Sequence, residues 1–240
     1  MDIVNVAFRP FGIQHLLALG AICGLGALIA WGCRRLEDSG RAWLGRTLGA
    51  LLVAYAAVMY IHLVVSGEFG VDWALPCELC HWVLIACIVT LFHPNQLASE
   101  IAYFWGFGGT LQAALTPDIA AAFPSWDFVM FFWGHGITLL AIVFLIAGRA
   151  FRPRRNSVFR MFLALNVYGV VAGLIDVAFG WDYGYLCQKP LRPSLLDYLG
   201  PWPWYLVWIE VLAPAIFFIL LLPWYLVDRF KKPKEVVSSP

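Results

Sequence analysis

The stretch FVMFFWGHGITLLAIVFLIA, from Phe128 to Ala147, contains no acidic or basic side chain other than one histidine, His135. An α-helix rises about 1.5 Å per residue, so roughly 20 apolar residues cross the hydrocarbon core of a bilayer, which is about 30 Å thick. This stretch therefore predicts a transmembrane helix. It also places His135 about two helical turns inside the membrane.

The whole chain has the composition of a membrane protein, because 62% of its 240 residues are apolar and only 13% are charged. Its mean hydropathy is +0.77, and the apolar residues come in long blocks. The sequence predicts an all-α, polytopic membrane protein with seven transmembrane helices. Besides Phe128–Ala147, the expected spans are Ile13–Gly32, Thr47–Val65, Cys77–Phe92, Leu97–Leu115, Phe159–Phe179 and Trp204–Leu226.

Basic residues gather on alternate connections, which predicts the orientation, since Lys and Arg accumulate on the cytoplasmic side. The connection after the first span carries four arginines, the one after the fifth carries five, and the C-terminal tail carries one arginine and three lysines. The opposite side holds only Arg9, Lys189 and Arg192. We therefore expect the N-terminus outside and the C-terminus in the cytoplasm.

No part of the chain between spans is long enough to fold alone, so residues 1–240 are expected to form a single transmembrane domain with a basic cytoplasmic tail at about 228–240. The first span is expected to be a retained helix and not a cleaved signal peptide. The net charge of +1 gives no reason to expect nucleic acid. The expected partners are membrane lipids, protein partners are left open, and the expected location is the bacterial plasma membrane.

Polar side chains inside hydrocarbon are costly, so their depth is informative. With the predicted orientation, nearly all of them fall in the outer half of the bilayer, and only His93 lies at the inner end. His135 is flanked by Gly134 and Gly136, which allow a close approach by another backbone or a substrate. The outer group consists of His15, His62, Cys77, Cys80, His81, Gln112, Thr116, His135, Asp176 and Glu210.

Cys77, Cys80 and His81 share one face of a helix predicted from Leu75 to Trp82 with Pro76 in its first turn, because spacings of three and four residues bring side chains together. A thiol at a helix N-terminus beside an imidazole is a plausible nucleophile. Buried cysteines also serve as small apolar residues in membrane helices, an explanation that suffices for Cys23, Cys33 and Cys87.

Several alternatives remain open for these residues. CxxCH, from Cys77 to His81, matches the haem attachment pattern, and CxxC could exchange or form disulfides with Cys187 as partner. The histidines His15, His62, His81 and His135 could converge on zinc, although no helix supplies an HxxxH or HExxH pair. A retinal protein is disfavoured because no span contains a lysine.

Six segments of the chain resemble the YwaF-like integral membrane proteins, which are grouped with the eukaryotic transmembrane protein 164 family. Their length, order and spacing make a chance match improbable. The segments are HLLAL from His15, LPCELC from Leu75, YFWGFGGTLQAALTPDI from Tyr103, FPSWDFVMFFWGHG from Phe123, DYGYLCQKP from Asp182 and SLLDYLGPWPWY from Ser194.

The resemblance implies a seven-helix fold and, by similarity to the eukaryotic branch, a phospholipid acyltransferase that uses Cys and His. The family's cysteine falls on Cys80 and its histidine on His135. This chain departs from the family at three positions. Cys77 stands where the family usually has an apolar residue, Glu78 where it has His or Gln, and Asp182 where it has Asn. His15, Gln112, Asp118 and Lys189 also stand at family motif positions.

The leading hypothesis is acyl transfer or acyl hydrolysis on a membrane phospholipid in the outer half of the bilayer. Cys80 would attack an ester carbonyl, and His135 or His15 would carry the proton. The competing hypothesis is a non-catalytic lipid-binding or transporter-like bundle. No cofactor and no metal are expected. The candidate substrate-binding residues, among which Gln112 could stabilise an oxyanion, are Gln112, Thr116, Asp118, Asp182, Lys189 and Arg192.

Overall fold

The computed structural model describes residues 6–230. This part of the chain is 75% helical and contains no strand, so the all-α class is confirmed. An isolated bridge joins Ala7 and Ala121. The elements are α1 (Ile13–Cys33), α2 (Asp38–Val65), α3 (Val71–Ala74), α4 (Leu79–Phe92), α5 (Gln96–Trp105), the π-helical turn η1 (Gly106–Thr110), α6 (Leu111–Leu115), α7 (Trp126–Gly148), α8 (Ser157–Phe179), the 3₁₀ turns η2 (Tyr183–Tyr185) and η3 (Leu195–Leu199), and α9 (Trp204–Phe230).

Five helices of the described part, α1, α2, α7, α8 and α9, are long and apolar enough to cross a membrane. The chain is therefore an integral membrane protein. The other two predicted spans form shorter helices: α4 has 14 residues, and the range 97–115 is divided among α5, η1 and α6. Seven spans and an outside N-terminus stay predictions.

The start of the third predicted span differs in the structure. A short helix, α3, ends at Ala74, and Leu75 is extended with φ −73° and ψ 130°. Leu75 precedes Pro76, and the proline ring disfavours helical geometry in the residue before it. Glu78 is also extended, so α4 begins at Leu79 and not at Cys77.

Helix α7 is the centre of the bundle. In its apolar 18-residue stretch 61% is buried inside the protein, compared with 17% in the corresponding stretch of α2 and 11% in those of α1, α8 and α9. It contacts α1, α2 and α4. Glycines permit this close packing: a Cβ at Gly45 of α2 would lie 2.7 Å from the ring of Phe144 in α7, and one at Gly148 of α7 would lie 3.0 Å from the sulfur of Cys33 in α1. Small residues let membrane helices approach until their backbones nearly touch.

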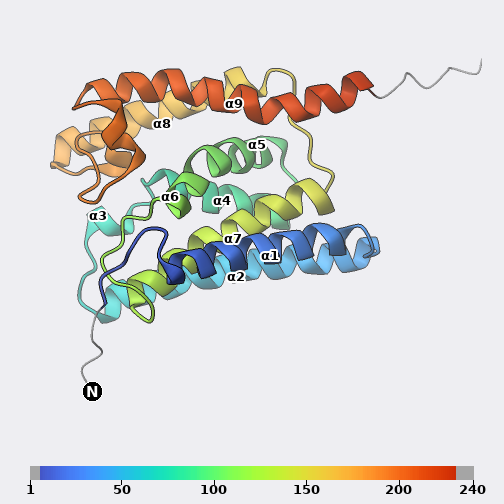
Figure 1. Ribbon diagram of the computed structural model, residues 1–240, viewed down its shortest axis with the longest axis horizontal. Coiled ribbons are helices and arrows are strands. Elements are labelled where there is room, and N and C mark those ends of the chain that lie inside the picture. The colour runs from blue at the N-terminus through green and yellow to red at the C-terminus, as the bar shows by residue number, and fades with distance from the viewer. Residues whose placement is uncertain (1–5, 231–240) are drawn as a thin grey trace, which may run out of the picture.

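The helices form layers that run in roughly the same direction. Figure 1 shows α8 and α9 along one edge, α1 and α2 along the opposite edge, and α7 with α4 to α6 between them. Two aromatic side chains of α5 fasten the outer pair to the middle layer. The hydroxyl of Tyr103 donates to the carbonyl of Leu220 in α9 (2.8 Å), and the indole of Trp105 donates to the carbonyl of Met161 in α8 (3.2 Å).

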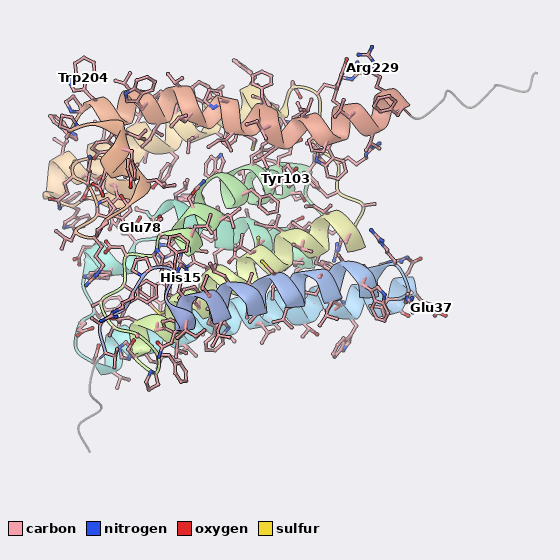
Figure 2. All side chains as sticks on the ribbon, viewed as in Figure 1. His15, Glu37, Glu78, Tyr103, Trp204 and Arg229 are labelled. Carbon is pink, nitrogen blue, oxygen red and sulfur yellow. The ribbon has the colours of Figure 1, made fainter. Side chains whose placement is uncertain are left out.

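Charged connections meet at one end of the bundle. Figure 2 shows Glu37 and Arg229 at that end and His15, Glu78 and Trp204 toward the other. At the charged end the fully buried carboxylate of Glu100 lies 3.3 Å from the guanidinium of Arg160. This asymmetry is the observation on which the predicted orientation depends. Most of the predicted basic tail, 228–240, lies outside the described residues.

Candidate functional site

Cys80 and His135 line the same small cavity between α2, α4, η1 and α7. Its volume is about 20 Å³, which is enough for one water molecule. The two residues come from different helices, α4 and α7, so their proximity is a result of tertiary packing. The complete lining is Tyr55, Cys80, His81, Leu84, Thr110, Gly134, His135 and Thr138.

His135 is oriented by its own helix. Its Nδ1 lies 2.9 Å from the carbonyl oxygen of Phe131, one turn earlier, and its ring stacks on the Phe131 ring with centroids 4.0 Å apart. A carbonyl oxygen only accepts hydrogen bonds, so in the neutral imidazole Nδ1 carries the proton. Nε2 is then the nitrogen that can accept a proton, which is the arrangement of a general base.

Tyr55 forms part of the cavity wall because α7 has no side chain at position 134. A Cβ on Gly134 would lie 2.4 Å from Cζ of Tyr55, a distance that carbon atoms do not adopt. The two glycines beside His135 therefore admit side chains of neighbouring helices. Gly134 admits Tyr55 of α2, and Gly136 admits Ile22 of α1.

A second, larger cavity lies directly beside the first. It has a volume of about 510 Å³, within the range of small-molecule sites. Most of its lining is apolar and comes from α2 and α4, whereas Asp72, Glu78 and Asp182 supply its acidic groups. We call it the apolar groove. Tyr55, His81 and Leu84 line both spaces and form the wall between them.

Two polar atoms near the small cavity have no hydrogen-bond partner. They are Nδ1 of His81 and Oγ1 of Thr110, and both atoms are buried. Buried polar atoms without a partner are rare and often mark an ordered water or a ligand. Both residues belong to the cavity lining, so a water molecule there could satisfy them. Sequence reasoning missed Thr110 and Tyr55; the glycine-rich run before Thr110, which forms a π-helical turn, was the available signal.

His15 lies in a different environment. Its Nδ1 accepts from the backbone N–H of Phe11 (2.9 Å), so Nε2 carries the proton and donates to the carbonyl of Ala114 (2.9 Å). The side chain is fully buried, and it belongs to neither cavity lining. The structure thus uses His15 to join the start of α1 to the end of α6.

One of the six candidate substrate-binding residues lines a cavity, and the others pair with one another or with nearby groups. Asp182 lines the apolar groove, and the other five do not. Asp118 pairs with Arg192 (3.3 Å) and Lys189 pairs with Asp197 (3.8 Å). Gln112 has a buried side-chain oxygen without a partner, whereas the hydroxyl of Thr116 donates to the backbone carbonyl of Gln112.

The loop between α8 and α9 contributes a phenol, Tyr183, to the lining of the apolar groove. The Tyr183 hydroxyl donates to the backbone carbonyl of Asp72. Burial, with nearby Cys77 and three acidic groups, raises the pKa of Tyr183 to about 12. The phenol therefore stays protonated near neutral pH and keeps this donor.

The structure also bears on the alternative chemistries. All six cysteines are free, so no disulfide joins Cys77, Cys80 and Cys187. The four histidines that could converge on zinc are dispersed. His62 stacks on Trp126 with ring centroids 4.1 Å apart, and both nitrogens of His15 are hydrogen-bonded to the backbone of Phe11 and Ala114. Only His81 and His135 share a cavity.

The fold and the cavity define an integral membrane helical bundle with a thiol and an imidazole enclosed beside an apolar groove. The chain belongs to the TMEM164 family, which it matches over residues 10–221. Comparisons with curated proteins and with solved structures give no significant match. The narrower grouping with YwaF-like proteins stays a prediction.

Proposed function

We propose that this protein transfers or hydrolyses an acyl chain of a membrane phospholipid, with Cys80 as nucleophile and His135 as general base. The observation that carries the proposal is the common wall between the two spaces. An apolar groove suited to an acyl chain lies next to a cavity lined by a thiol and an imidazole.

In the proposed reaction the Cys80 thiol passes its proton to Nε2 of His135 as sulfur attacks the ester carbonyl. The C–O bond of the ester breaks, and the leaving alkoxide of the lysolipid takes that proton from His135. An acceptor hydroxyl or water then gives its proton to His135 and attacks the thioester, which regenerates the thiol. Because the proton moves during attack, no free thiolate has to persist in an apolar environment.

The roles of the other lining residues follow from their chemistry. The Thr110 hydroxyl can donate a hydrogen bond to the oxygen that becomes negative during attack. Nδ1–H of His135 stays on the Phe131 carbonyl and keeps the ring oriented. His15 takes no part in this proposal, because both of its nitrogens already have partners.

The small cavity holds only one water, so the ester must enter from the groove. We propose that Tyr55 or His81 moves aside when an acyl chain occupies the groove, because these side chains separate the two spaces. Exclusion of water until that movement would limit wasteful hydrolysis.

The test is intact-mass and peptide mass spectrometry of the protein in nanodiscs that contain phospholipid with an isotope-labelled acyl chain. We expect a labelled thioester on Cys80 and label transfer to an added lysolipid. Cys80→Ala should abolish both, and His135→Ala should reduce both at least 100-fold, the usual scale for general base catalysis.

Two controls match these variants. Cys87→Ala removes a buried thiol of the same helix, and His62→Ala removes a histidine outside both cavities; both should retain the adduct and the transfer. Stoichiometric unmodified phospholipid with no transfer in the wild type would instead support the non-catalytic lipid-binding bundle. Equal turnover in wild type and Cys80→Ala would refute the proposed chemistry.

A further inference from the structure

A second cluster of reactive side chains lies where α8 ends and the loop toward α9 begins. Asp176 belongs to the last turn of α8, and Asp182 and Cys187 belong to the following loop. One carboxylate oxygen of each aspartate and the Cys187 sulfur all lie within 4.8 Å of one another. The acyl-transfer proposal uses neither Asp176 nor Cys187.

The carboxylate of Asp176 is buried, and only one of its two oxygens has a hydrogen-bond partner. Its side chain is 1% exposed. Oδ1 accepts from the backbone N–H of Tyr183 (2.9 Å), whereas Oδ2 is buried with no hydrogen-bond partner. A buried carboxylate oxygen without a donor or a cation is energetically costly.

Nearby basic side chains do not supply the missing charge. Within residues 6–230, the two basic residues of the same loop pair elsewhere, Lys189 with Asp197 and Arg192 with Asp118. A third carboxylate approaches instead, since Oε2 of Glu78 accepts from the backbone N–H of Gly184 (3.1 Å). Negative groups therefore collect around this loop, and no salt bridge from the described residues reaches Asp176 or Asp182.

Backbone hydrogen bonds bring the loop ligands together. Oδ1 of Asp182 accepts from the N–H groups of Cys187 (2.8 Å) and Gln188 (3.2 Å). The turn holds the Cys187 side chain close to that of Asp182. Cys187 is exposed and Asp182 is half-buried, so an ion could enter from the aqueous side.

We propose that Asp176, Asp182 and Cys187 bind one Zn²⁺ ion per chain. Two carboxylate oxygens and a sulfur are zinc ligands, and the soft thiolate disfavours Mg²⁺ and Ca²⁺. Zinc–ligand bonds are about 2.0–2.3 Å long, so the three atoms need only a small inward movement. Water would complete a four-coordinate site. The sequence predicted no metal, because these ligands are not in a recognised zinc spacing.

Zinc at this position would fasten the loop to α8. Asp182 also lines the apolar groove, so the ion would hold one wall of the groove in place. A metal that binds only the folded chain stabilises it by mass action. The inference is independent of acyl transfer, because metal content and thermal stability are its readouts.

The experiment uses the full chain in detergent, without an affinity tag, after chelator treatment. Zn²⁺ alone is added, and bound zinc is measured by elemental mass spectrometry and calorimetry. We expect one zinc per chain and a rise in Tm. Co²⁺ in place of zinc should produce the near-ultraviolet absorption of a thiolate–cobalt bond.

Two variants should weaken zinc binding, and two matched variants should retain it. Asp176→Asn and Cys187→Ser each lose one ligand, so zinc affinity should fall at least tenfold, within the range for metal-site changes. Cys187 is exposed, which keeps that variant informative if Asp176→Asn does not fold. Asp127→Asn and Cys23→Ser alter an exposed carboxylate and an exposed thiol away from the loop and should bind as the wild type does.

Three results would overturn the inference. They are the absence of stoichiometric zinc in the wild type, unchanged zinc affinity in Cys187→Ser, and tighter binding of Ca²⁺ than of Zn²⁺. None of them affects the acyl-transfer proposal, which depends on Cys80 and His135.

Discussion

The ring of Tyr55 on α2 lies where a side chain of residue 134 on α7 would have to be, because a Cβ on Gly134 would be 2.4 Å from Tyr55 Cζ. This contact places the Tyr55 ring between the small cavity that contains Cys80 and the apolar groove, since Tyr55 lines both. The glycine beside His135 is thus a packing requirement of the site.

Gly134→Ala should displace the Tyr55 ring and lower stability. Overpacking by one methyl group in a tight interior costs about 1–3 kcal/mol, so thermal unfolding in detergent should occur at a lower temperature. Gly24→Ala in α1 is the matched control, because a Cβ there meets nothing within 4 Å. Equal stability of the two variants would contradict this account of Gly134.

Tyr55→Ala should open the wall and expose Cys80 to the groove. We expect an apolar maleimide to modify Cys80 faster than in the wild type, because access controls the reactivity of a buried thiol. Peptide mass spectrometry assigns the modified cysteine. Tyr60→Ala is the control on the same helix, since Tyr60 lines the groove but not the small cavity. Slow modification of Cys80 in both variants would argue against a wall at Tyr55.

His15→Ala should weaken the fold without removing the chemistry. It leaves the Ala114 carbonyl and the Phe11 N–H without their partner, and an unsatisfied buried group costs about 1–3 kcal/mol. Thermal unfolding should show this loss, whereas labelled acyl groups should still appear on Cys80. His135→Ala should give the opposite pattern. Loss of the acyl adduct in a folded His15→Ala protein would restore His15 as a catalytic candidate.

Glu100→Gln should destabilise the charged end of the bundle. Glu100 is fully buried and faces Arg160 at 3.3 Å and Arg154 at 3.9 Å. The arginine side chains that remain are 28% and 52% exposed, so water solvates their charges, and the loss should be about 1–3 kcal/mol, as for a hydrogen bond to a charged group. Asp38→Asn is the control, since its pair with Arg41 is exposed and exposed pairs contribute little. Similar unfolding temperatures for both variants would refute a structural role for Glu100.

The ranges of the long helices could be predicted closely, except that α2 begins at Asp38, nine residues before the predicted start at Thr47. The first predicted span, Ile13–Gly32, corresponds to α1 at Ile13–Cys33, and Phe159–Phe179 corresponds to α8 at Ser157–Phe179. Uninterrupted apolar runs are a local property of the chain, so hydropathy detects them. The short helix α3 and the later start of α4 at Leu79 were not predicted, because hydropathy does not register the backbone restriction before Pro76.

The candidate site was only partly predictable. Cys80 and His135 were selected from motif resemblance and depth, and the structure brings them to one cavity. His15 was selected in the same way, yet its ring is engaged with Phe11 and Ala114. Depth along the membrane does not specify which way a side chain points around its helix axis, so it could not separate these two histidines.

Apolar runs and their caps determine, from the amino-acid order alone, that this chain is helical and embedded in a membrane, because each span must satisfy its backbone hydrogen bonds within itself. The rotation of each helix about its axis was decided only in the tertiary structure. That rotation depends on side chains meeting between helices, such as Tyr55 against Gly134 and Phe144 against Gly45. The small cavity and the apolar groove result from it, whereas the cluster of Asp176, Asp182 and Cys187 depends on hydrogen bonds of the loop after α8.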